Sequence, residues 1–160
     1  MITIQEFCEA LRRNVSILQQ QIAGLTQEDS LLQLPFRGNC LNWVLGHLAN
    51  NRDQMLRLLG AEPALGPGGE RYGHGSEPIT ADGPGVLQMA DLLAAITRSQ
   101  TALEAALAGV TEDQLNHPAP LGSRPMTVRD RLFFSYYHET YHTGQTELLR
   151  QLAGKDDKVI

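Results

Sequence analysis

Apolar residues recur at intervals of three and four along four stretches of the chain, the spacing that places them on one face of an α-helix. No segment shows the alternation of apolar and polar residues that is typical of a strand. The pattern therefore predicts an all-α chain with four long helices. The predicted helices cover residues 3–25, 39–59, 85–107, and 126 to 152 or 153.

Polar residues at the ends of these stretches support the predicted boundaries. Thr3 with Glu6, and Thr127 with Asp130, have the spacing of a capping box, in which two side chains bind the free N–H groups of a helix start. Asn39 is the predicted N-cap of the second helix. We read the intervening segments as loops.

The longest connection, residues 61–85, joins the second and third predicted helices. Together with Gly60 it holds eight of the fifteen glycines and four of the eight prolines, and we expect no regular structure in it. Loops this long are uncommon in a compact domain and often have a function. The fold predicted for residues 1–160 is one domain, a four-helix bundle with a long Gly/Pro-rich crossover. A crossover of this length also permits the two helices to run in the same direction.

Charge and composition narrow the range of partners. The net charge is −5 and the basic residues form no cluster, which argues against nucleic acid as a partner. Cys8 and Cys40 are the only cysteines, so a disulfide framework is not expected and a reducing compartment is. No signal peptide and no apolar run of ~20 residues is found. We expect a cytoplasmic protein that does not bind membranes.

The strongest chemical signal is a pair of histidines, His138 and His142, in the fourth predicted helix. Residues four apart lie on the same face of a helix, so both imidazoles can bind one metal ion. His47, beside the apolar face of the second helix, is the natural third ligand. Three imidazoles leave coordination positions open, which is typical of a catalytic site. The alternative is that these histidines are ordinary core or surface residues.

Several neighbours are candidates for supporting roles. Asn51, one turn after His47, and Gln145 are placed to orient a metal-bound water or a substrate. Cys40 is expected to be a small packing residue, with a thiol near the site as the alternative. Glu139 is expected to point outward, in a solvated or interface role, because adjacent helical residues differ by ~100° in direction. A general base or a hydrogen-bond acceptor for a ligand histidine is the alternative.

Two glycines inside predicted helices need an explanation. Gly46 and Gly144 stand within two residues of a histidine, although glycine inside a helix costs ~1 kcal/mol relative to alanine. Close approach of a neighbouring helix or a ligand is the expected cause, and ordinary packing is the alternative.

The last helix has aromatic residues on more than one side, which indicates a second contact surface or cover from the long loop. These residues are Phe133, Phe134, Tyr136, Tyr137 and Tyr141.

The segments Trp43-x-x-Gly46-His47-Leu48 and His138-x-x-x-His142-x-Gly144-Gln145 resemble the two motifs of the DinB / YfiT-like family. The order and spacing of the motifs, the chain length and the four predicted helices match over nearly the whole chain. The resemblance implies a bundle in which His47, His138 and His142 bind one divalent metal ion. We expect Zn or Ni in preference to Mn or Fe. The resemblance also implies a homodimer.

The activity that the resemblance implies is less specific. The family includes bacillithiol- and mycothiol-dependent transferases and isomerases, and the iron-binding domain of ergothioneine-forming enzymes. We expect a metal-dependent enzyme acting on a small molecule, with thiol-dependent S-transfer as the first hypothesis. A metal-dependent hydrolase, a metal- or ligand-binding stress protein without turnover, and a purely structural bundle are the alternatives.

Substrate contacts are expected from both helices and loops. Asn51, Gln145, Trp43 and Tyr72 are the candidate substrate-binding residues. Residues 61–85 are expected to cross one end of the bundle and to form part of the rim of the metal site, with a plain surface crossover that makes no contact near the histidines as the alternative. There Arg71, Tyr72 and His74 are placed to meet the substrate. His74 and His117 stand in loops and are expected to be solvated, with a role for His74 as a further metal ligand as the alternative.

Overall fold

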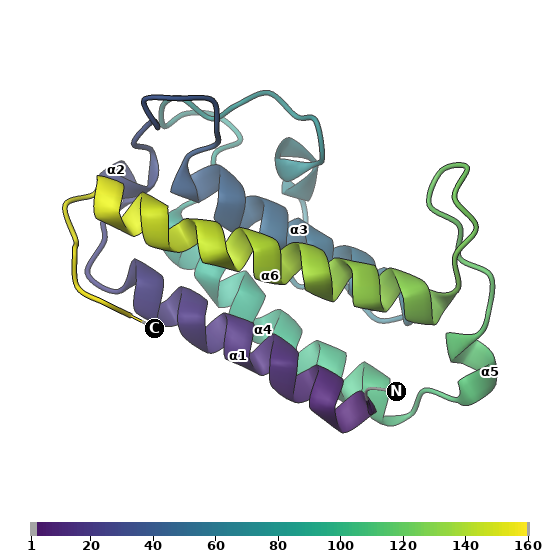
Figure 1. Cartoon of the computed structure of the whole chain (residues 1–160). Coiled ribbons are helices and arrows are strands. Elements are labelled where there is room, and N and C mark those ends of the chain that lie inside the picture. Colours follow the sequence, from purple (N-terminus) through teal and green to yellow (C-terminus); the bar gives the residue numbers. More distant parts are fainter. Residues whose placement is uncertain (1–2, 160) are drawn as a thin grey trace.

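Four long helices dominate the computed structural model, which describes residues 3–159 (Figure 1). The long helices are α1 (Ile4–Ile22), α3 (Leu41–Leu58), α4 (Met89–Ala108) and α6 (Val128–Leu152). Short helices α2 (Gln27–Ser30) and α5 (Glu112–Leu115) and the 3-10 turn η1 (Gly69–Tyr72) lie in the connections. Only isolated β-bridges occur between residues 3 and 159, so the all-α prediction is confirmed. In the same residues, no helix is both long and apolar enough to cross a membrane.

The predicted capping boxes are present, whereas two other boundaries were wrong. The side chains of Thr3 and Thr127 each accept a bond from the N–H three residues later. α3 starts at Leu41 with Cys40 as its N-cap and no side-chain cap, so Asn39 does not have the predicted role. α4 starts at Met89 and not at residue 85, because Gly85 has a φ of +81°, which a right-handed helix excludes.

The helices form a bundle in which α1 and α3 lie diagonally opposite each other. Each of these two helices packs against both α4 and α6. Asn42 near the start of α3 donates to the carbonyl of Leu87 just before α4, and Arg52 further along donates to Ser99. α3 and α4 therefore run in the same direction, the arrangement that the long crossover permits (Figure 1).

The crossover is anchored to the bundle by buried side chains and by hydrogen bonds. Tyr72 and Ile79 are 0% and 1% exposed and belong to the main hydrophobic cluster. The Asp53 carboxylate on α3 accepts bonds from the N–H groups of Ala64 (2.7 Å) and Leu65 (3.2 Å). The glycine content obscured these anchors, because a few apolar side chains suffice to attach a loop whose composition is otherwise that of a linker.

Polar residues separate the two hydrophobic clusters of the bundle. One cluster includes Leu48 of α3 and the crossover, and the other includes Met55 of the same helix. Between them Arg52 is fully buried and forms an ion pair with Glu139 of α6, which is also 0% exposed. The prediction that Glu139 points outward was therefore wrong, because α6 turns this position toward the bundle axis.

Candidate metal centre

Three histidines from α3 and α6 bring their ring nitrogens together. Nε2 of His138 lies 3.3 Å from Nε2 of His47 and 3.1 Å from Nε2 of His142. Two nitrogens bound to one ion at ~2.0–2.1 Å are roughly 2.9–3.4 Å apart at octahedral to tetrahedral angles. The spacing therefore fits a single divalent ion. Within residues 3–159, no other group of three His, Cys, Asp or Glu side chains is close enough to hold one.

Hydrogen bonds orient two of the three rings. Nδ1 of His47 lies 2.8 Å from the carbonyl oxygen of Tyr72, and a carbonyl only accepts, so Nδ1 carries the proton. Nδ1 of His142 lies 2.7 Å from Oε1 of Gln145, an acceptor as well. Each Nε2 is therefore left with its lone pair directed toward the other histidines. Such outer partners fix the tautomer and orientation of metal-binding histidines.

His138 occupies the middle position in the cluster. Its Nε2 is the atom that both other histidines approach, and its Nδ1 is buried without a hydrogen-bond partner. The ring lies nearly parallel to that of Phe134, at 10° with centroids 6.1 Å apart. The ring of His138 is thus held by packing, and no hydrogen bond to Nδ1 orients it.

The surroundings keep all three imidazoles neutral at pH 7. Burial, together with the neighbouring His142 and His47, lowers the pKa of His138 from 6.5 to about 4. Burial also lowers the pKa of His47, against the effect of its bond to the Tyr72 carbonyl. It lowers the pKa of His142 as well, against the bond to Gln145. Neutral imidazole is the form that binds a metal ion.

Gly46 explains how the Tyr72 carbonyl reaches His47. A Cβ atom at Gly46 would lie 2.0 Å from Cδ1 of Tyr72, so only glycine lets this ring pack directly on α3. A close approach does occur at Gly46, but the neighbour is a loop side chain and not the helix or ligand that was predicted. At Gly144 a Cβ would meet nothing within 4 Å, so the protein makes no such approach to this glycine.

Aromatic side chains and the crossover border the histidines. Trp43 stacks on His47 at 4.6 Å between centroids and 16° between planes, and its Nε1 donates to Oγ of Ser76 (3.0 Å). Tyr141 meets the ring of His142 edge-on at 5.4 Å. Ser76 accepts a bond from Trp43, and the Tyr72 carbonyl bonds to His47. The crossover therefore borders the candidate metal centre, as predicted.

The four predicted substrate-binding residues have different environments. Asn51 is 8% exposed and its Nδ2 donates to the carbonyl of Ser135, linking α3 to α6. Tyr72 is fully buried, so its side chain has a structural role and not the predicted contact with a substrate. Trp43 is nearly buried against His47. Gln145 is exposed beside the cluster, where a ligand can reach it.

Two other candidates lie outside the cluster. Cys40 is 1% exposed, its Sγ donates to the carbonyl of Ile79, and burial raises the pKa of its thiol. It is a packing residue and not a reactive thiol. His74 and His117 are exposed, as predicted. His74 is nevertheless close enough for its charge to lower the pKa of both His47 and His138.

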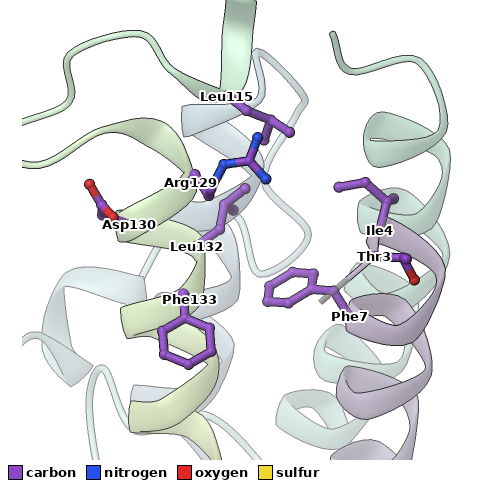
Figure 2. Close-up of a pocket in the computed structure, with 8 residues that line it drawn as sticks. All are labelled: Thr3, Ile4, Phe7, Leu115, Arg129, Asp130, Leu132 and Phe133. Carbon is purple, nitrogen blue, oxygen red and sulfur yellow. The ribbon is translucent and has the colours of Figure 1, made fainter. Parts of the chain in front are cut away.

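A separate apolar pocket of about 220 Å³ lies where α1, α5 and α6 meet (Figure 2). None of the three histidines lines it. Its polar residues have other partners, since Asp130 caps the start of α6 and Arg129 forms an ion pair with Glu112. Without a free group for chemistry, this pocket is not the candidate active site. Its lining residues are Thr3, Ile4, Phe7, Leu115, Arg129, Asp130, Leu132 and Phe133.

Two groups that contribute to the candidate metal centre were not predicted from the sequence. The Tyr72 carbonyl is a main-chain group, which no residue type signals, although Gly46 marked the position where the Tyr72 ring packs. Ser76 lies in a segment interpreted as irregular, and only the fold brings it to Trp43.

A four-helix bundle with three convergent histidines defines a class of helical proteins whose inward side chains are placed to hold a metal ion. The comparison with protein families identifies it more closely: the model of the DinB superfamily matches residues 10–146. The chain belongs to the DinB superfamily.

A solved structure supports the fold. The crystal structure of a conserved protein from Enterococcus faecalis aligns with a TM-score of 0.74 and 21% sequence identity. The alignment covers 97% of this chain and 99% of that one. The similarity confirms the bundle over nearly the whole chain. No curated protein matches the sequence.

Proposed function

We propose that this DinB-superfamily protein is a metal-dependent enzyme in which His47, His138 and His142 hold one divalent ion. The observation that carries the proposal is the convergence of three neutral Nε2 atoms at separations that suit one ion. Membership of the superfamily supports it. A purely structural bundle would gain nothing from three desolvated imidazoles whose ring nitrogens face one another.

The donor set favours Zn or Ni. The cluster offers three imidazoles and no carboxylate. Imidazole suits Zn, Ni and Fe, whereas Mn prefers oxygen ligands, and a given nitrogen site binds Fe(II) more weakly than Ni(II). We therefore place Zn and Ni first, ahead of Fe and Mn.

Three protein ligands leave at least one coordination position for a small molecule. A bound divalent ion lowers the pKa of a thiol or water that it binds, and so supplies a nucleophile near neutral pH. The residues of the chain then have two tasks, which are to hold the histidines in place and to border the approach to them. His47 and His142 are held in place by Tyr72 and Gln145, and the exposed rings of Phe134 and Tyr141 flank the approach to the histidines.

S-transfer from a low-molecular-weight thiol is the preferred reaction. Glu139, the carboxylate next to His138 in the sequence, is fully buried and bonded to Arg52, so it is not available as a general base. In S-transfer the thiol loses its proton to solvent, its sulfur bonds to an electrophilic carbon, and the leaving group takes the electrons of the broken bond. A thiol with a lowered pKa needs no protein base for this sequence.

Metal-dependent hydrolysis is the second candidate. His74 is exposed in the bordering crossover, and its charge acts on His47 and His138. An imidazole in this position is suited to carry protons to or from a water molecule. A metal- or ligand-binding protein without turnover is the outcome if neither reaction is found.

The experiment is a parallel assay of the Zn- and Ni-loaded protein. Bacillithiol, mycothiol, glutathione and coenzyme A are each tested with 1-chloro-2,4-dinitrobenzene, and p-nitrophenyl acetate is tested without a thiol. We expect conjugation with one of the thiols, and its loss in His142→Ala. Ester hydrolysis alone, lost in the same variant, would favour the second candidate. Metal binding without either reaction would overturn the enzyme proposal.

A further inference from the structure

The polar centre of the bundle is a fully buried ion pair. Nε of Arg52 lies 2.7 Å from Oε2 of Glu139, and Nη2 lies 2.8 Å from Oε1, so the two planar groups meet through two parallel hydrogen bonds. Both side chains are 0% exposed. This fork geometry constrains distance and orientation together.

Every donor of the guanidinium has a partner. Beyond Glu139, Nη1 donates to Oγ of Ser99 and Oε1 of Gln100, and Nη2 donates to the carbonyl of Leu11. With the two bonds to the carboxylate, these contacts account for the five N–H groups of arginine. The partners lie on α1, α4 and α6, so Arg52 of α3 connects all four long helices.

The pair lies beside the metal centre on the same two helices. Arg52 follows His47 on α3 by five residues, and Glu139 stands between His138 and His142 on α6. All three histidines therefore come from the two helices that this ion pair joins. A shift of one residue between helices corresponds to ~1.5 Å and ~100°, which would separate the ring nitrogens.

We propose that the Arg52–Glu139 pair positions the metal centre by fixing the register of α3 against α6. The inference rests on the proposed function, because it assigns the pair a role in metal affinity. Apolar contacts alone tolerate small sliding movements, whereas the bidentate pair does not. A buried pair of this kind is often no more stabilising than apolar residues of similar volume, so stability does not explain its presence.

The structure suggests a variant that separates positioning from stability. In Arg52→Met/Glu139→Leu, both charges are removed together, so neither is left buried alone. Asn14 Nδ2 of α1 also donates to Oε1 of Glu139 (3.1 Å). Most former partners keep other bonds: Ser99 Oγ donates to the carbonyl of Ile96, and Asn14 Nδ2 donates to Oγ1 of Thr140. We therefore expect the metal-free double variant to fold with a urea midpoint close to that of the wild type.

The test measures Ni and Zn affinity by competition with a chelator, and the visible spectrum of the Co(II)-loaded protein. The double variant is expected to bind metal on the order of 10- to 100-fold more weakly, with an altered Co(II) spectrum. Arg52→Lys keeps the charge but loses the fork, and serves if the double variant does not fold; a smaller loss in the same direction is expected. Asp157→Asn breaks the Arg150–Asp157 pair at the far end of α6 and should leave both readouts unchanged.

The positioning role would be overturned if a folded double variant had the metal affinity and the Co(II) spectrum of the wild type. If the double variant does not fold, the same result in Arg52→Lys would overturn it. Either outcome would leave the metal centre intact. A wild-type protein that binds no metal would instead overturn the proposed function, and this inference with it.

Discussion

The carbonyl oxygen of Tyr72 lies 2.8 Å from Nδ1 of His47, although the two residues are 25 positions apart. One belongs to the crossover and the other to α3. The bond leaves Nε2 of His47 free to face His138, and so makes a loop residue part of the candidate metal centre. Changes in the crossover should therefore alter metal binding even though none of its side chains is a proposed ligand.

Gly46→Ala tests this relationship. The added methyl would lie 2.0 Å from the Tyr72 ring, so the ring and its carbonyl must move away from His47. We expect metal affinity to fall on the order of 10-fold or more. Overpacking should also lower the free energy of unfolding by about 1–3 kcal/mol. A competition titration and a urea melt measure the two effects.

Gly144→Ala is the matched control for Gly46→Ala. It changes a glycine in the interior of α6 where a Cβ meets nothing within 4 Å. Alanine is favoured over glycine in a helix by ~1 kcal/mol, so stability should rise slightly and metal affinity should not change. Equal losses of affinity in both variants would show that the Tyr72 contact is not the cause.

The lowered histidine pKa values predict how the stability of the metal-free protein depends on pH. Burial lowers the pKa of His138 from 6.5 to about 4 in the folded state. Between these values the unfolded chain binds more protons, so the free energy of unfolding rises with pH across this window. The contribution is fully present above pH 6.5 and is lost as the pH falls toward 4.

Urea melts at pH 5 and pH 7.5 measure this dependence. We expect a lower midpoint at pH 5 for the wild type, and a smaller difference for His138→Gln, which has no titrating ring. An unchanged difference in His138→Gln would assign the pH effect to other groups.

His74 is predicted not to be a metal ligand. It is exposed and lies outside the group of three histidines whose ligand atoms converge. His74→Ala should therefore retain one metal ion per chain, with an unchanged Co(II) spectrum. Loss of stoichiometric metal would show that a fourth side chain closes the coordination shell.

We propose that α6 mediates a homodimer. Large apolar side chains on one face of α6 are solvent-exposed, from 37% for Phe134 to 63% for Tyr137. Phe134, Tyr137, Tyr141 and Leu148 follow one another at spacings of three, four and seven, the pattern of a helix–helix seam. Exposed apolar surface of this kind commonly marks a contact with another protein.

Light scattering at micromolar concentration tests the dimer. We expect twice the chain mass for the wild type and a shift toward the monomer for Tyr137→Glu. Phe36→Glu is the control, because Phe36 is equally exposed, at 58%, in a different segment. A monomeric wild type would contradict the proposal.

The helices and the His138/His142 pair were accessible from the sequence because both depend on local spacing, whereas His47 as the third member rested on the bundle prediction and on the family resemblance. The i, i+4 relation placed His138 and His142 on one face, and the apolar periodicity placed α3 and α6 in a bundle. Glu139 was misplaced because its direction depends on how α6 is turned within the fold, which neighbouring spacing does not fix.

The attachment of the crossover to the bundle also could not be predicted from the sequence. Its glycines and prolines indicate a loop, but Tyr72 and Ile79 are buried only because α3 offers Gly46 and an apolar face to receive them. Long-range contacts of this kind have no local pattern. The Arg52–Glu139 pair, 87 residues apart, was missed for the same reason.

Metal binding by the three histidines is tested most directly by an anomalous X-ray scan of the purified protein with metal analysis of single alanine variants. We predict one Zn or Ni ion per wild-type chain, and loss of stoichiometric metal in His47→Ala, His138→Ala and His142→Ala. One bound ion per chain in the triple variant would contradict the account.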